Sequence, residues 1–118
     1  MSLSTDVPDF SDQMRVIEQI KSLKVSSALI DTKIKAEESK IVRIVTTDAD
    51  YFIDGKRPSM DYIRTVYFPY GLDGSLGTLR EELAIQLAEL EAAKNLLKAY
   101  SQKVDVWRTL ESSKRAGV

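Results

Sequence analysis

The chain contains neither cysteine nor histidine. Without cysteine there is no disulfide bond and no thiolate chemistry, and without histidine the commonest general base and the commonest transition-metal ligand are both missing. The sequence also carries no motif that is typical of a catalytic site. The sequence therefore predicts a protein that is not an enzyme, with no catalytic residue, no cofactor and no metal site.

An excess of charge of one sign and long hydrophobic runs are also absent. The 17 basic and 18 acidic residues give a formal net charge of -1, so no overall field attracts a polyanion. No run approaches the roughly 18 apolar residues of a membrane span, and the start of the chain lacks the features of a signal peptide. We expect no membrane association, and either a cytoplasmic location or a place in a particle such as a virion.

Glycine and proline are absent between Phe10 and Ile53, which predicts one helix over residues 11–45 with Ser11 as its N-cap. Residues 1–10 are expected to form a loose leader. Apolar residues repeat along the helix with a heptad period, interrupted by Ser27 and Glu37. Its a positions are Ile20, Ile34 and Ile41, and its d positions are Val16, Leu23, Ile30 and Ile44.

A second heptad pattern predicts another long helix, over residues 78–113. Its a positions are Leu76, Leu83, Leu90, Leu97 and Val104, and its d positions are Leu79, Gln86, Ala93, Tyr100 and Trp107. Thr78-x-x-Glu81 has the pattern of a capping box at the helix start. A 3.5-residue period places these side chains in one stripe along the helix and predicts that a partner helix packs against the stripe.

Residues 46–77 form a turn-rich insertion between the two patterns. Residues 51–53 are a short β-prone run, Asp54-Gly55 is a turn dipeptide, and Ser59 is placed to cap a short helix that Pro69 ends. The whole chain is therefore predicted to be one all-α domain. Its architecture is a long helical hairpin or coiled-coil-like bundle with a short central turn and helix insertion.

Two patterns in the insertion resemble ligand sites. Asp50, Asp54 and Asp61 match acidic positions of an EF-hand loop, but the cations Lys56 and Arg57 lie among them and a simple turn is the expected structure. The glycines at 71, 74 and 77 precede a helix, as in phosphate-binding loops. They lack the spacing and the lysine of such loops, so they too predict a turn.

An aromatic patch, defined as Phe52, Tyr67, Phe68 and Tyr70, lies near several cations in the insertion. Three interpretations remain open: a local mini-core, a protein-contact patch, and a platform on which nucleic-acid bases stack. Nucleic-acid binding is the least favoured of the three.

The apolar arc of the last predicted helix is wider than one partner helix covers. Leu87 falls at e, Leu96 and Leu110 at g, and Ile85 and Val106 at c, a width typical of bundles. We expect a homo-oligomer or a larger protein assembly, the alternative being a monomeric three-helix hairpin. The predicted interface residues are Leu76, Leu83, Leu87, Leu90, Leu96, Leu97, Tyr100, Val104, Trp107 and Leu110.

A motif in the insertion resembles one found in short uncharacterised phage and prophage-type helical proteins. In those proteins a helix leads into Tyr-x-x-Asp-Gly, followed by a serine, a tyrosine and a Leu-rich helix. The matching residues are Tyr51, Asp54, Gly55, Ser59 and Tyr62. Met60 stands where the pattern tends to have tryptophan. The resemblance implies a virion or virion-assembly component without enzyme activity.

These observations predict a structural or assembly protein that acts through helix–helix contacts. One alternative is a cytosolic coiled-coil adaptor or chaperone-like protein that binds a client through the same apolar stripe. Another is a weak binder of single-stranded nucleic acid that uses the aromatic patch and the basic tail, Lys114 and Arg115.

Overall fold

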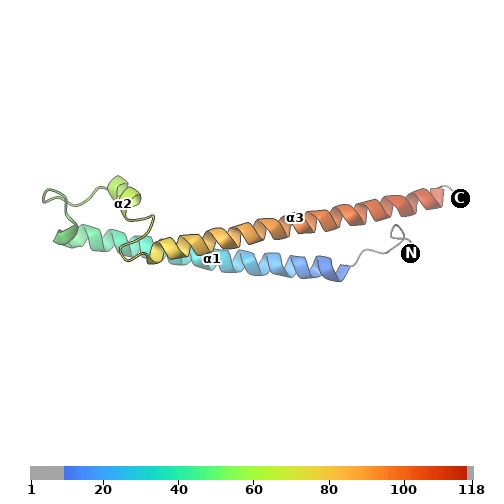
Figure 1. Ribbon diagram of the computed structural model, residues 1–118, viewed down its shortest axis with the longest axis horizontal. Coiled ribbons are helices and arrows are strands. Elements are labelled where there is room, and N and C mark those ends of the chain that lie inside the picture. The colour runs from blue at the N-terminus through green and yellow to red at the C-terminus, as the bar shows by residue number, and fades with distance from the viewer. Residues whose placement is uncertain (1–9, 117–118) are drawn as a thin grey trace. The chain divides into compact units, whose positions relative to one another are not determined.

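The computed structural model describes the backbone of residues 10–116 and the side chains of residues 10–114. Its order is α1 (Phe10–Thr47), a 3₁₀ turn η2 (Ala49–Tyr51), α2 (Met60–Val66) and α3 (Ser75–Ala116) (Figure 1). Within these residues extended pairing is limited to an isolated bridge between Ile53 and Lys56. The all-α prediction is confirmed. Apart from Phe10, the predicted leader lies outside the described residues.

The chain divides into two compact units, and both long helices run through each of them. Unit 1 comprises the chain up to Lys24 together with the part from Ala88 onward, and unit 2 comprises Val25–Leu87. In unit 2 the end of α1 packs against the start of α3, so the two helices run antiparallel as in a hairpin.

The core of unit 2 combines heptad positions with residues outside the heptad pattern. Its buried members are Ile30, Ile34, Ile41, Val45, Ile63 and Leu76. Val45, Ile63 and Leu76 are 0% exposed. Val45 is an e residue of α1, and Ile63 comes from the short helix α2. Both belong to one core cluster, so α2 packs with α1 beyond the a and d positions of that helix.

The core of unit 1 is a plain two-helix contact. Val16 and Ile20 of α1 pack against Leu90 and Ala93 of α3, with the partly buried Leu23, Leu97 and Tyr100 around them. Further along α3, Val104 is buried and Trp107 is half-buried. These are a and d residues of the two predicted heptads, so the pattern identified the sides on which α1 and α3 meet.

Both long helices extend beyond their predicted limits at each end. The first begins at Phe10, so Ser11 lies inside the helix instead of capping it. It ends at Thr47, where the hydroxyls of Thr46 and Thr47 donate to the carbonyls of Val42 and Arg43 at 2.6 and 2.5 Å. Each hydroxyl thus bonds back to a carbonyl one turn earlier in the helix, a local pairing that is common for threonine.

The start of α3 differs most from the prediction, because the helix begins at Ser75 and the capping box at Thr78 does not form. Thr78 lies within the first turn, where its backbone N–H donates to the carbonyl of Gly74 at 3.2 Å. The side chain of Asp73 accepts instead, from the Ser75 backbone N–H at 3.0 Å and from the Ser75 hydroxyl at 2.6 Å. Such an acceptor satisfies one of the free N–H groups at a helix start.

A polar layer interrupts the helix contact in unit 2. Ser26 donates a hydrogen bond to the Gln86 side chain across the two helices, and Ser27 beside it is buried. Gln86 and Ser27 are the polar d and a residues of the heptads. A paired polar layer of this kind favours one helix register over others, since a shifted register would leave its groups without partners.

Candidate protein contact surface

The motif in the insertion makes a tight turn, as predicted. Asp54 has φ 52° and Gly55 has φ 77°. Ile53 and Lys56 exchange two backbone hydrogen bonds, of 2.8 and 3.0 Å, around them. Two successive residues at positive φ define the turn type for which Asp-Gly is a preferred sequence. The β-prone run is thereby reduced to a single bridge.

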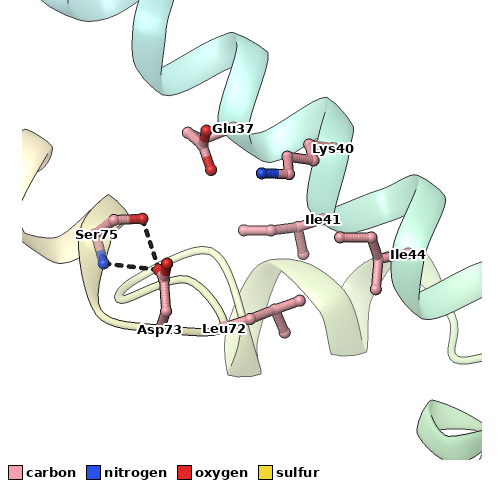
Figure 2. A pocket seen from close by; sticks show the side chains of 7 residues that line it. All are labelled: Glu37, Lys40, Ile41, Ile44, Leu72, Asp73 and Ser75. Atoms are coloured by element: carbon pink, nitrogen blue, oxygen red, sulfur yellow. Dashed lines mark hydrogen bonds between the residues drawn. The ribbon is translucent and has the colours of Figure 1, made fainter.

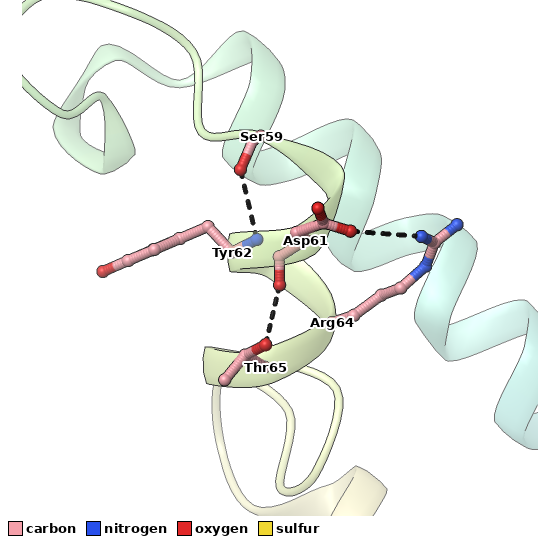
Figure 3. A network of polar contacts seen from close by, with 5 residues as sticks. All are labelled: Ser59, Asp61, Tyr62, Arg64 and Thr65. Carbon is pink, nitrogen blue, oxygen red and sulfur yellow. Dashed lines mark hydrogen bonds and ion pairs between the residues drawn. The ribbon is translucent and has the colours of Figure 1, made fainter.

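Ser59 caps α2, which confirms the predicted N-cap. Its hydroxyl accepts from the Tyr62 backbone N–H at 3.2 Å, and the Thr65 hydroxyl donates to the Asp61 carbonyl at 2.8 Å (Figure 3). The Asp61 carboxylate pairs with Arg64 at 3.7 Å. Among the described residues no group of three metal-ligand side chains gathers, so the EF-hand pattern has no structural counterpart there.

The aromatic residues of the insertion divide between a small core and the surface. The ring of Tyr67 makes edge contacts with Tyr51 at 6.0 Å and with Tyr62 at 5.9 Å, so it lies against both tyrosines of the motif. Partial removal from water, followed by the neighbouring Tyr62 and Tyr51, raises the pKa of the Tyr67 hydroxyl. Tyr51, Tyr67 and Phe68 pack against the core of unit 2.

The remaining members of the aromatic patch differ in exposure. Phe52 is half-buried, whereas Tyr70 is 71% exposed. Tyr70 also lies against Gly77, because a Cβ added to Gly77 would come within 3.1 Å of its ring. Two of the four patch residues, Tyr67 and Phe68, are thus used in local packing, which supports the mini-core interpretation for them.

Arg80, near the start of α3, contacts both α1 and the segment that follows α2. Its Nε donates to the Phe68 carbonyl at 2.9 Å, and its second guanidinium nitrogen pairs with Glu38 of α1 at 2.8 Å. The two charged side chains retain 37% and 24% of their exposure. Both occupy e positions, which meet each other when helices pack antiparallel. The sequence analysis did not identify this contact.

A double-mutant cycle of Glu38→Gln and Arg80→Gln should give a coupling energy of about 0.5 to 1 kcal/mol. The pair is only partly removed from water, so its value lies near the upper end for surface pairs. Urea denaturation of the four proteins measures it. A parallel cycle of Arg80→Gln with Asp31→Asn is the control, since Asp31 pairs with Lys35 instead. Equal coupling in both cycles would contradict a specific Arg80–Glu38 contact.

A pocket of about 130 Å³ lies where the loop before α3 meets α1 (Figure 2). Its lining residues are Glu37, Lys40, Ile41, Ile44, Leu72, Asp73 and Ser75. Hydrogen bonds from Ser75 lower the pKa of Asp73, with a smaller contribution from the charge of Lys40. The lowered pKa favours the carboxylate form of Asp73, which accepts the hydrogen bonds at the start of α3.

Gly71 and Gly74 give the loop beside this pocket its path. They have φ values of 81° and 86°, which other residues adopt rarely. A Cβ on Gly71 would lie 3.0 Å from Cβ of Leu76, a fully buried residue. These two glycines therefore serve the tight connection into α3, in agreement with the predicted turn, whereas Gly77 lies inside α3.

In unit 1, α3 carries a second stripe with apolar side chains on residues outside the core that it forms with α1. Positions c and g lie about 40° apart on a helix of 3.6 residues per turn, so together they form one narrow face. We call it the c/g face. It consists of Glu89, Ala92, Leu96, Ala99, Lys103, Val106 and Leu110, all of them exposed. Their spacing alternates between three and four residues, which is the spacing of a helix contact.

The charges of α3 in unit 1 are densest away from the c/g face. Those on the solvent side are concentrated at b and e, on Glu91, Lys94, Lys98, Asp105 and Arg108, all exposed. The f positions flanking the c/g face carry Ala88, Asn95, Gln102 and Thr109, which are exposed and uncharged. Only Glu89 and Lys103 place charge on the face itself. A helix side that is exposed yet low in charge is typical of a protein contact surface.

The predicted interface residues therefore fall into two groups. Leu76, Leu90 and Val104 are buried, and Leu83, Leu97, Tyr100 and Trp107 are half-buried, all at a and d positions. Leu96 and Leu110 are exposed on the c/g face, whereas Leu87 is exposed at position e. Ala92 and Ala99 of the c/g face were not among the predicted interface residues. Their spacing from Leu96 and the uncharged f positions are the signals that could have identified them.

Fold and surface together describe a helical-hairpin protein with an exposed helix face on which apolar side chains recur. Comparisons with protein-family models, with curated proteins and with solved structures each gave no match. No helix in the described part of the chain combines the length and apolar character needed to cross a membrane.

Proposed function

We propose that this chain is a non-enzymatic assembly protein that acts through helix–helix contacts made by the c/g face of α3. The observation that carries the proposal is an exposed 3-4 apolar spacing whose flanking f positions are uncharged. Leu96, Val106 and Leu110 remain 44%, 60% and 42% exposed. Covering the exposed part of each would contribute roughly 1 kcal/mol, so a helix laid along the face gains several kcal/mol.

We propose first that the c/g face mediates self-association. Self-association would build the chain into a larger protein particle. The near-zero net charge is compatible with close packing of copies, because they repel one another weakly. The resemblance of the Tyr51–Tyr62 motif to phage-type proteins supports a virion or virion-assembly particle as the setting. In that role the turn and the capped helix α2 act as a fixed joint between α1 and α3.

Sedimentation equilibrium of the full chain should show a defined oligomer at micromolar concentration. Leu96→Ser should weaken its association by about tenfold, since a large apolar side chain would be lost from the contact. Leu87→Ser is the matched control, because Leu87 is exposed to a similar degree but lies outside the c/g face. Its association should stay close to that of the unmodified chain.

Two results would contradict the proposal. One is a strict monomer up to about 100 μM, which limits the binding free energy to weaker than roughly -5.5 kcal/mol. The other is an oligomer that Leu87→Ser weakens and Leu96→Ser does not, since the contact would then lie elsewhere.

A further inference from the structure

We propose that the partner of the c/g face is a second copy of this chain, bound antiparallel with Leu96 of one copy opposite Ala99 of the other. This inference rests on the function proposed above and specifies its geometry. It follows from the order of side-chain sizes and charges along the face between Glu89 and Val106.

Side-chain size along the face is self-complementary when the second copy runs in the opposite direction. In an antiparallel contact, a g residue of one helix shares a layer with a c residue of the other. With Leu96 opposite Ala99, Ala92 falls opposite Lys103 and Glu89 opposite Val106. The small alanines at c thus face the large residues at g, which lets the helices approach while filling the space between them.

The two charges on the face have no partner within their own helix. None of the ion pairs among the described residues includes Glu89 or Lys103. The residues three and four positions away from each, where helical ion pairs form, are all uncharged. Glu91 and Asp105, by contrast, each have a basic residue three positions along. Glu89 and Lys103 are therefore available to a partner.

An antiparallel second copy supplies opposite charges to both residues. In the proposed register, Glu89 of one copy lies one layer from Lys103 of the other, about 4.5 Å along the axis. The symmetry of the pair creates this contact twice. A parallel arrangement would instead place Glu89 beside Glu89 and Lys103 beside Lys103, which is unfavourable in a partly dry contact. Charge thus favours the antiparallel pair.

Charge reversal tests the inference. Glu89→Lys alone and Lys103→Glu alone should each associate about tenfold more weakly than the unmodified chain, because both cross-contacts become repulsive. An equimolar mixture of the two variants should recover the affinity, since position 89 of each variant then meets the opposite charge at position 103 of the other. The double variant Glu89→Lys with Lys103→Glu should recover it as well. Sedimentation equilibrium at low salt measures all five samples.

Glu91→Lys is the control, because Glu91 is exposed on the charged side of the same helix. It should leave association unchanged, and circular dichroism should show the same helix content in every variant. Unchanged association in both single reversals, or a mixture no tighter than either variant, would overturn the antiparallel contact. Oligomerisation would then remain, and with it the proposed function. A monomeric unmodified chain would overturn both.

Disulfide trapping gives a second readout, since the chain has no cysteine of its own. A mixture of Leu96→Cys and Ala99→Cys chains should form the mixed disulfide faster than either chain forms its own. Leu96→Cys chains that cross-link fastest with each other would indicate a parallel pair, and that result would overturn the inference.

Discussion

Ile63→Ala should lower the free energy of unfolding by about 2 to 5 kcal/mol. Ile63 is 0% exposed and is the residue that α2 contributes to the buried core of unit 2. Its truncation would lose the transfer free energy of the side chain and leave a cavity between α2 and the two long helices. Domains of this size have a total stability of about 5 to 15 kcal/mol, so the loss is a large share. Urea denaturation followed by circular dichroism measures the change.

Val66→Ala is the control for this prediction. Val66 lies one turn along the same short helix but is 46% exposed, so its truncation should cost less than about 1 kcal/mol. If both substitutions had equal effects, Ile63 would not be the buried anchor of α2. The short helix α2 would then contribute little to the stability of the core.

Leu90→Ala should also destabilise strongly, by about 2 to 5 kcal/mol. Leu90 is 8% exposed and packs in the core of unit 1 with Val16 and Ile20 of α1. The single tryptophan, Trp107, lies in the same unit, so its fluorescence reports the loss locally while circular dichroism reports the whole chain. Leu97 is half-buried, and Leu97→Ala should have a smaller effect of the same sign.

Lys98→Ala and Leu96→Ala are the controls for the register. Both side chains are exposed, and Lys98→Ala should change stability by no more than about 0.5 kcal/mol. Leu96→Ala is the same chemical change as Leu90→Ala and should cost less than about 1 kcal/mol at a protein concentration where the chain is monomeric. A Lys98→Ala variant as unstable as Leu97→Ala would show that the helix faces have been misplaced.

Much of the fold was predictable because, in a helix packed along a partner helix, the side chains that face the partner recur every 3.5 residues. The positions of Ile34, Ile41 and Leu90 in the heptads predicted their burial, and each is buried. Asp54-Gly55 and Ser59 were equally predictable, since a turn at positive φ and a helix N-cap depend on local chemistry.

The contacts that join the insertion to the long helices were not predictable in this way. Nothing in the neighbourhood of Arg80 indicates that it reaches both Glu38 and the Phe68 carbonyl, because these residues are distant in sequence. Thr78 matched the pattern of a helix start, yet α3 begins three residues before it, at Ser75. There the loop places Asp73 where its side chain accepts from the Ser75 backbone N–H. A local pattern cannot show which of two suitable residues the loop brings into place.

By itself, the sequence determined the helical class, the residues on which α1 and α3 meet, and the turn and cap that lead into α2. These features depend on periodicity and on neighbouring residues, which a chain carries wherever it folds. Only the tertiary structure decided that Val45 and Ile63 are buried, that Tyr67 and Phe68 pack inward, and that Leu96 and Leu110 stay exposed. Burial depends on which segments meet in space, and apolar character alone does not separate a residue covered by its own chain from one left exposed.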